Sequence, residues 1–174
     1  MLGTAVYPNI NKQTRSSSQE AENGSVEFTI TDASDKILEE SPGPVTIRGG
    51  AFQSIYTFEN NTTDATSITR SLIATDSFRL VRDRALFKFI NGSNELVDVY
   101  ILRPGQDLDE VAPLLNDMGF AGQQNSESIA NDVEYVVRNS DNTETLASIS
   151  NTQQEGVSYT LVFDTQGVLH LLID

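Results

Sequence analysis

Apolar and polar residues alternate along most of this 174-residue chain, and the clearest alternation spans residues 85–102. One phase of each run in this stretch is apolar: Phe87 and Phe89 in the first run, and Val97, Val99 and Ile101 in the second. A period of two is typical of a β-strand with one buried face. Asn91-Gly92 lies between the runs, and both residue types tolerate positive φ. This dipeptide therefore predicts a hairpin turn or a corner between two sheets.

Similar runs predict further strands on both sides of this centre. They are expected at residues 4–7, 26–31, 49–58, 68–73, 78–81, 133–137, 146–149, 157–163 and 168–173. Residues 119–125 are expected to form a loop. The segment 108–118 has a helical pattern, but Pro113 limits it to a short helical turn. Many short strands, with turn signals about every 8–12 residues, predict an all-β antiparallel sandwich.

The two halves of the chain share a pattern at a constant offset of 107 (133 − 26). Without a gap, these positions coincide: Val26 with Val133, Phe28 with Tyr135, Ile30 with Val137, Gly49 with Gly156, and Phe52 with Tyr159. Self-similarity of this kind predicts two copies of one β-unit, so residues 26–56 should superpose on 133–163. The counterpart of the central strands would lie before Met1. We therefore expect an incomplete first unit at residues 1–83 and a complete second unit at 84–174.

The second half of the chain contains three short motifs: Phe89-Ile90-Asn91, Asp98-Val99-Tyr100 and Gly156-Val157-Ser158-Tyr159-Thr160. With them, residues 85–174 resemble a bacterial exported β-sandwich domain of unknown function that often occurs in tandem copies. The sequence departs from that family where Asn131-Asp132 stand in place of a usual glycine. The resemblance implies two tandem immunoglobulin-like sandwiches outside the cytoplasm. It carries no catalytic residue over to this chain.

Charge and composition exclude several classes of partner and of site. The net charge of −14 argues against nucleic acid and against adsorption to anionic lipid. Because the chain has no cysteine, a disulfide, a thiolate nucleophile and a cysteine-bound zinc are all excluded. No apolar run approaches the ~20 residues of a membrane span, so we predict no transmembrane segment.

The first residues, Met1-Leu2-Gly3-Thr4, lack the basic start and apolar core of a signal peptide. Either the protein is not exported, or a leader has been removed. Together with the resemblance, this leads us to expect a periplasmic or cell-surface protein whose leader was removed.

His170 is the only histidine, and it alternates with Leu169 and Leu171 on an expected strand. A Ser-His-Asp site on an α/β-hydrolase fold would be marked by a Gly-x-Ser-x-Gly elbow, which this sequence lacks. We therefore interpret His170 as a structural residue on a strand face.

The densest carboxylate group is Asp107, Asp109 and Glu110. Paired carboxylates across a cleft could hydrolyse a glycoside, and oxygen-rich loops could hold Ca²⁺, but no EF-hand spacing is present. The favoured interpretation is a solvated acidic loop. Asp98 lies in the middle of a strand, and we expect it to face solvent or to accept hydrogen bonds from a neighbouring loop. Three asparagines begin glycosylation-type triplets and are interpreted as turn residues: Asn23, Asn60 and Asn91.

Two classes of function follow from this pattern. The favoured one is a non-catalytic binding or structural module of the bacterial cell envelope, with an unknown protein or carbohydrate as partner. The alternative is a carboxylate-dependent polysaccharide hydrolase, which would need two facing carboxylates about 5–9 Å apart. We assign no catalytic, cofactor-binding or metal-binding residue, and no cofactor.

Overall fold

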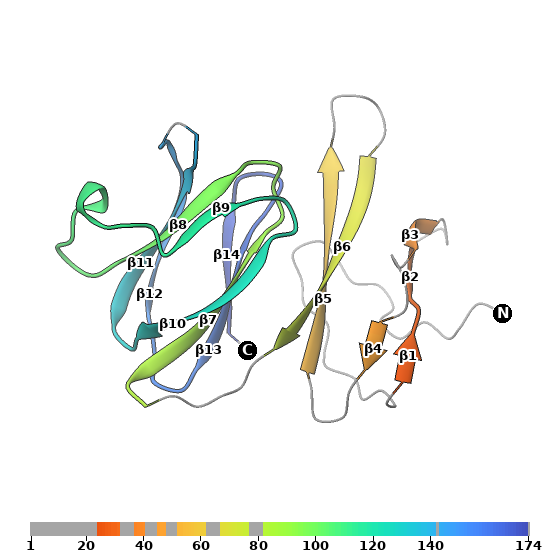
Figure 1. Ribbon diagram of the computed structural model, residues 1–174, viewed down its shortest axis with the longest axis horizontal. Coiled ribbons are helices and arrows are strands. Elements are labelled where there is room, and N and C mark those ends of the chain that lie inside the picture. The colour runs from red at the N-terminus through yellow and green to blue at the C-terminus, as the bar shows by residue number, and fades with distance from the viewer. Residues whose placement is uncertain are drawn as a thin grey trace. The chain divides into compact units, whose positions relative to one another are not determined.

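The computed structural model describes residues 24–31, 37–40, 45–47, 52–61, 67–76, 82–141 and 143–173. Within these ranges the regular elements are β-strands and one short 3-10 helix, with no α-helix (Figure 1). The predicted all-β class is therefore confirmed. Internal contacts divide the chain into two compact units, Met1–Gln53 and Ser54–Asp174. The boundary expected after residue 83 stays a prediction.

Two four-stranded sheets of the second unit form the sandwich (Figure 1). The first sheet has the order β10-β7-β13-β14, with β7 at Arg84–Asn91, β10 at Gln123–Ile129, β13 at Ser158–Phe163 and β14 at Leu169–Ile173. The second has the order β12-β11-β8-β9, with β8 at Val97–Leu102, β9 at Leu115–Met118, β11 at Asp132–Asn139 and β12 at Thr145–Thr152. Neighbouring strands are antiparallel, except that β7 and β13 are parallel.

Side chains from both sheets meet in one apolar interior. The ring of Phe87 on β7 lies 5.7 Å, centroid to centroid, from the ring of Tyr135 on β11. The alternation of apolar and polar residues predicts five core residues on the inward face of their strands. All five are at most 2% exposed: Phe89, Val99, Tyr135, Tyr159 and Leu161. Burying a side chain of this size stabilises the fold by about 1.5–3 kcal/mol. The predicted inward phase of these strands is therefore confirmed.

A buried polar cluster joins the sheets within this interior. The Tyr135 hydroxyl accepts a hydrogen bond from Nε2 of Gln153, and Oε1 of Gln153 accepts one from the hydroxyl of Ser128. The Tyr159 hydroxyl accepts the backbone N–H of Gln154 at 2.9 Å. Burial raises the pKa of the Tyr135 phenol, so it stays protonated at physiological pH. Each polar group thereby gains a partner in a place where an unpaired one would be costly.

The chain passes from one sheet to the other at Asn91-Gly92, so this dipeptide forms a corner and not a hairpin. Asn91 is fully buried, and its Nδ2 donates to the carbonyls of Glu95 and Met118 at 2.8 and 2.7 Å. Gly92 does not take positive φ. A Cβ at Gly92 would instead overlap the ring of Phe58, so the glycine is needed for close approach.

A pair of long strands covers the outer face of the first sheet. β5 (Phe52–Asn61) and β6 (Ser67–Asp76) pair with each other and run in opposite directions (Figure 1). Phe58 and Ala74 pack against Ile90 and Val162 in a second apolar cluster. The sheet is therefore buried on both faces near its centre.

The first unit contains two small two-stranded sheets. β1 (Gly24–Val26) pairs with β4 (Val45–Ile47), and β2 (Thr29–Thr31) pairs with β3 (Ile37–Glu40). By contrast, the matching residues 133–137 lie in the single strand β11. The predicted gap-free superposition is therefore wrong over this stretch. Two prolines, at positions 42 and 44, separate β3 from β4 in the sequence, and a proline has no N–H for a strand ladder.

One element of the repeat is kept. The register of β2 shifts between Ile30 and Thr31, and that of β11 shifts between Val137 and Arg138, which is the same place after adding 107. Gly156 takes a φ of 73°, while Gly49 lies outside the described residues. The prediction of two tandem units stays a prediction.

Two strands of the sandwich, β9 and β10, lie where a helical turn or a loop was expected. Residues 123–125 were expected in a loop but open β10, whose polar sequence QQNSESI has a single buried residue, Ser128. Its backbone pairs with β7 whatever its side chains are, so alternation could not reveal it. The short helical turn predicted in 108–118 is confirmed as the 3-10 helix η1 (Leu108–Glu110), which β9 follows. The strands expected at 4–7 and 78–81 lie outside the described residues.

Candidate functional site

An open hollow lies on the outer face of the second sheet, beside the loop that follows β8. Leu108 and Val111 of that loop pack on apolar side chains of β8 and β11, namely Tyr100, Leu102 and Val136. Next to this contact the surface forms a shallow depression of about 540 Å³, which continues into a second one of about 580 Å³. We call the two together the β11–β12 groove and define it by Leu102, Gln106, Glu134, Val136, Ser148 and Ser150.

The pairing of the strands explains why this surface is hollow. Glu134 of β11 stands opposite Leu102 of β8 on one side and Ser150 of β12 on the other. In the next row, Val136 stands opposite Ser148. The two serines are too small to fill the space above the sheet. The groove thus has a loop for one wall and small side chains at the edge strand on its other side.

The loop wall is a fixed turn. The side-chain oxygen of Gln106 accepts the N–H of Arg103 at 2.8 Å, and the N–H of Gln106 donates to the carbonyl of Arg103 at 3.1 Å. Gly105 takes a φ of 83°, a conformation that favours glycine. These contacts hold the wall in place without a ligand, which lowers the cost of ordering a site on binding.

Carboxylates outnumber cations in the groove. Asp107, Asp132 and Glu134 line it, with Arg103 as the one basic residue in its lining. Asp132 accepts the hydroxyl of Thr152 at 2.7 Å, and Asp107 accepts the N–H of Asp109 at 3.0 Å. The side chain of Glu134 is half-buried on the floor, and its carboxylate has no hydrogen-bond or ion-pair partner among the residues that the structure describes. It is the groove carboxylate left for a ligand.

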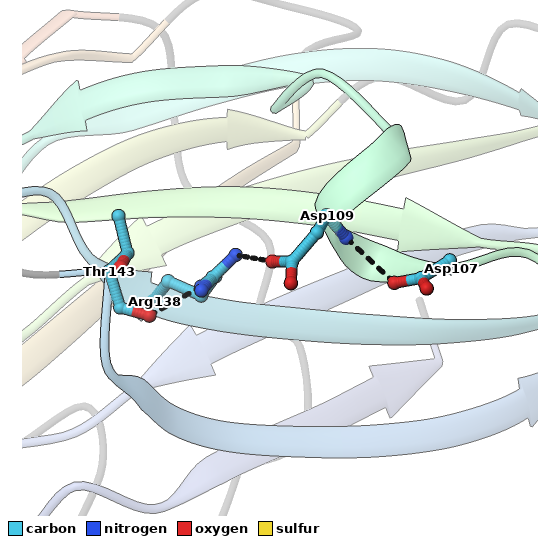
Figure 2. A network of polar contacts seen from close by, with 4 residues as sticks. All are labelled: Asp107, Asp109, Arg138 and Thr143. Carbon is cyan, nitrogen blue, oxygen red and sulfur yellow. Dashed lines mark hydrogen bonds and ion pairs between the residues drawn. The ribbon is translucent and has the colours of Figure 1, made fainter.

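The predicted acidic group is part of the structure that holds this loop (Figure 2). Asp107 caps η1 through its bond to the N–H of Asp109, and Asp109 pairs with Nη1 of Arg138 at 3.0 Å. The Nε–H of Arg138 donates to the carbonyl of Thr143 at 2.6 Å. The same guanidinium lies 5.8 Å from the ring centre of Tyr100. Within the described ranges, acidic and histidine side chains form no cluster of three or more that could hold a metal.

His170 lies on β14, as expected, and bonds to a carboxylate. Its Nε2 is 2.7 Å from Oδ2 of Asp164, a residue of the turn between β13 and β14. Asp164 Oδ1 also accepts the N–H groups of Gln166 and Val168, at 2.8 and 2.9 Å. Burial works to raise the pKa of Asp164, but the bonds from His170 and from these N–H groups outweigh it and lower the pKa below 3.8. The pair fixes a turn, and among the described residues no serine hydroxyl bonds to His170.

Asp98 accepts a hydrogen bond from a neighbouring loop, as predicted: its Oδ1 takes the hydroxyl of Ser140 at 2.7 Å. The same oxygen also takes the N–H of Asp117, in the adjacent strand β9, at 2.9 Å. Asn91 is buried and fully hydrogen-bonded, so its triplet is not open to glycosylation in the folded protein. Asn23 and the side chain of Asn60 lie outside what the structure describes.

The sequence interpretation missed the groove. Its floor residues, Glu134 and Val136, lie in the strand expected at 133–137, and the serines of β12 were given no role. A signal was present in residues 145–152, TLASISNT, where serine occupies two successive outward positions with no long side chain beside them. Asn151, which lines the groove, has a buried Nδ2 with no hydrogen-bond partner.

Comparisons with known proteins leave the family open: no protein-family model matches the chain, and no curated protein sequence matches it. In the portion of the chain that the structure describes, none of the helices is long and apolar enough to cross a membrane.

Proposed function

We propose that this chain is a non-catalytic binding module of the bacterial cell envelope that holds a protein or carbohydrate ligand in the β11–β12 groove. The observation that carries the proposal is the groove itself. It has a preformed wall, a half-buried carboxylate without a partner at Glu134, and small side chains that leave room for a ligand. The proposed location outside the cytoplasm rests on the family resemblance of residues 85–174.

The chemistry of the neighbouring polar groups supports binding over catalysis. Asp109 is ion-paired with Arg138, and Asp164 holds both His170 and two backbone N–H groups. Side chains in such roles stabilise loops and turns. A shallow, open surface also suits recognition of an extended ligand better than exclusion of water from a reacting bond.

We further infer that the fold is an immunoglobulin-like unit present in two copies. The register shifts of β2 and β11, which are 107 residues apart, support this, and so does the matching hairpin pattern of β2–β3 and β11–β12. The interrupted first copy then represents a diverged unit.

A block of the groove tests the binding proposal. Ser150→Trp would fill the space above Glu134, whereas Gln166→Trp adds the same ring to an exposed turn elsewhere. Glycan and peptide arrays should show ligands that the wild-type chain and Gln166→Trp bind and that Ser150→Trp does not. Equal binding by both variants contradicts the proposal.

A polysaccharide hydrolase remains the second candidate, because Asp107 and Glu134 line the same hollow. A pair of carboxylates flanking a glycosidic bond is the arrangement that such enzymes use. Turnover of a polysaccharide by the wild-type chain that is lost in both Asp107→Asn and Glu134→Gln would favour this candidate over the binding module.

A further inference from the structure

β12 is an edge strand without the usual protection. Among the described strands, none pairs with its far side. Its register with β11 is regular over residues 147–152, opposite 132–137. The strand, TLASISNT, carries no charge and no proline, the devices by which proteins usually keep an edge from pairing with another chain.

The other edges differ. β9 has Asp117 at a φ of 50° and a register shift against β8, which bends the edge. β10 carries Glu127. β14 contributes Leu172 to the apolar cluster beneath β5 and β6. β14 is also an edge without an acidic or basic residue other than His170, but the outer face beside it is covered by β5 and β6. β12 is thus the uncharged edge that borders an open groove.

The groove lies directly beside this edge. Ser148 and Ser150 point to the outer face, while Ile149 between them packs towards the core. A strand added to β12 would lie about 4.8 Å from it and about 10 Å from β11. Its alternate side chains would stand over the serines. The long side chains of lysine and arginine span that distance and would bring their charge to Glu134.

We propose that β12 binds an extended basic segment of a partner protein by strand addition, with its lysine or arginine side chains lying over Ser148 and Ser150 and pairing with Glu134. The inference rests on the proposed binding function and names its ligand class. Backbone hydrogen bonds to residues 147–152 supply affinity, and the groove selects alternate side chains. The lining holds three carboxylates and one cation, which favours a basic partner. A second copy of this chain is disfavoured because each copy carries a charge of −14.

Three synthetic peptides test the mode of binding. The probe is an eight-residue peptide of alternating lysine and threonine. One control has glutamate in place of lysine, and the other has proline in place of threonine, which keeps the charge but removes alternate N–H donors. The readout is the affinity in a titration and the hydrogen exchange of backbone amides by NMR.

We expect the lysine-threonine peptide to bind and both controls to bind at least about tenfold more weakly. Alternate amides within 147–152 should slow their exchange about tenfold or more, because only every second N–H of a strand faces the added one. Glu134→Gln should weaken binding about fivefold and flatten its salt dependence. Glu155→Gln, which removes the same charge from an exposed turn outside the groove, should leave the affinity unchanged.

Several results would overturn the inference. They are no binding of the lysine-threonine peptide, equal binding of the proline peptide, or binding without alternate protection in β12. Protection of the same amides in the free chain that grows with its concentration would identify a second copy as the occupant. If Ser150→Trp abolishes binding of an array ligand while β12 amides stay unprotected, the proposed function stands and strand addition falls.

Discussion

The two sheets of the sandwich share one interior, but their outer faces are covered differently. On the first sheet, apolar side chains of β7 and β13 are buried beneath Phe58 and Ala74 of the β5–β6 pair. On the second sheet, η1 and its loop cover apolar side chains of β8 and β11, and the β11–β12 groove lies open beside them. One face is packed like a core, and the other is partly left as surface.

The edge strands account for much of this difference. β14 presents Leu172 to the covering strands, whereas β12 presents Ser148 and Ser150 at its outer positions. A large apolar side chain needs a cover, and that cover adds stability. Small hydroxyl side chains need none, and they leave backbone and carboxylate groups within reach of a ligand. With the binding function proposed above, stability and recognition would separate onto opposite faces of one sandwich.

The largest effect that tests this comparison is Phe58→Ala. The Phe58 ring is 7% exposed and packs against Ile90 and Val162, so its loss should reduce the free energy of unfolding by about 3–5 kcal/mol. Urea denaturation followed by circular dichroism measures this loss.

The matched variant on the other face is Leu108→Ala. Because Leu108 is only half-buried against the second sheet, its truncation should cost about 1–2 kcal/mol. If Leu108→Ala destabilised the protein as much as Phe58→Ala, the two faces would be covered equally well and the comparison would fail.

Sequence patterns predicted the interior better than either outer face. Phe89, Val99 and Leu161 fall on unambiguous apolar phases, and a strand slipped by one residue would turn them all outward. β10 was missed because both of its phases are polar up to the last residue, Ile129. Its place at the edge depends on the backbone of β7, which its own residues do not encode.

The serines of residues 145–152 hint at an open face, but the position of the groove could not be predicted because it depends on which strands are neighbours. Glu134 and Ser150 stand opposite each other only once β11 pairs with β12, and nothing in either segment alone specifies that row. Gly92 gives a second example. Its lack of a Cβ is required by the ring of Phe58, a residue distant in sequence, and not by a local turn.

A further prediction concerns the interior that both sheets share. Tyr135→Phe removes the hydroxyl that accepts from Nε2 of Gln153 and leaves a buried amide unpaired. We expect a loss of about 1–3 kcal/mol in the free energy of unfolding, with little change in the fold by circular dichroism. Replacing Gln153 by leucine in the same background should restore part of the loss. If Tyr135→Phe left the free energy of unfolding unchanged, the cluster would not hold the sheets together.

The next prediction uses pH to probe the turn between β13 and β14, on the covered sheet. The pKa of Asp164 is lower in the folded protein than the ordinary 3.8, so the folded state favours the ionised carboxylate. Its contribution is complete above about pH 5 and is lost as the pH falls through the folded pKa. Asp164→Asn should therefore cost about 1 kcal/mol at neutral pH, and the difference from wild type should shrink below about pH 4. A difference that grew on acidification would have the wrong sign for this assignment.

The smallest effect should come from the ion pair over the second sheet. The Asp109 side chain is 80% exposed, so its attraction to Arg138 is screened by water and salt. Asp109→Asn should change the free energy of unfolding by less than about 0.5 kcal/mol, and even that difference should vanish in 1 M salt. Arg138→Met should cost more, about 1–2 kcal/mol, because the guanidinium also bonds to the Thr143 carbonyl and lies over Tyr100. If Asp109→Asn cost as much as Leu108→Ala, the loop would be held by its charges and not by its apolar contacts. The open face would then depend on salt in a way that the covered face does not.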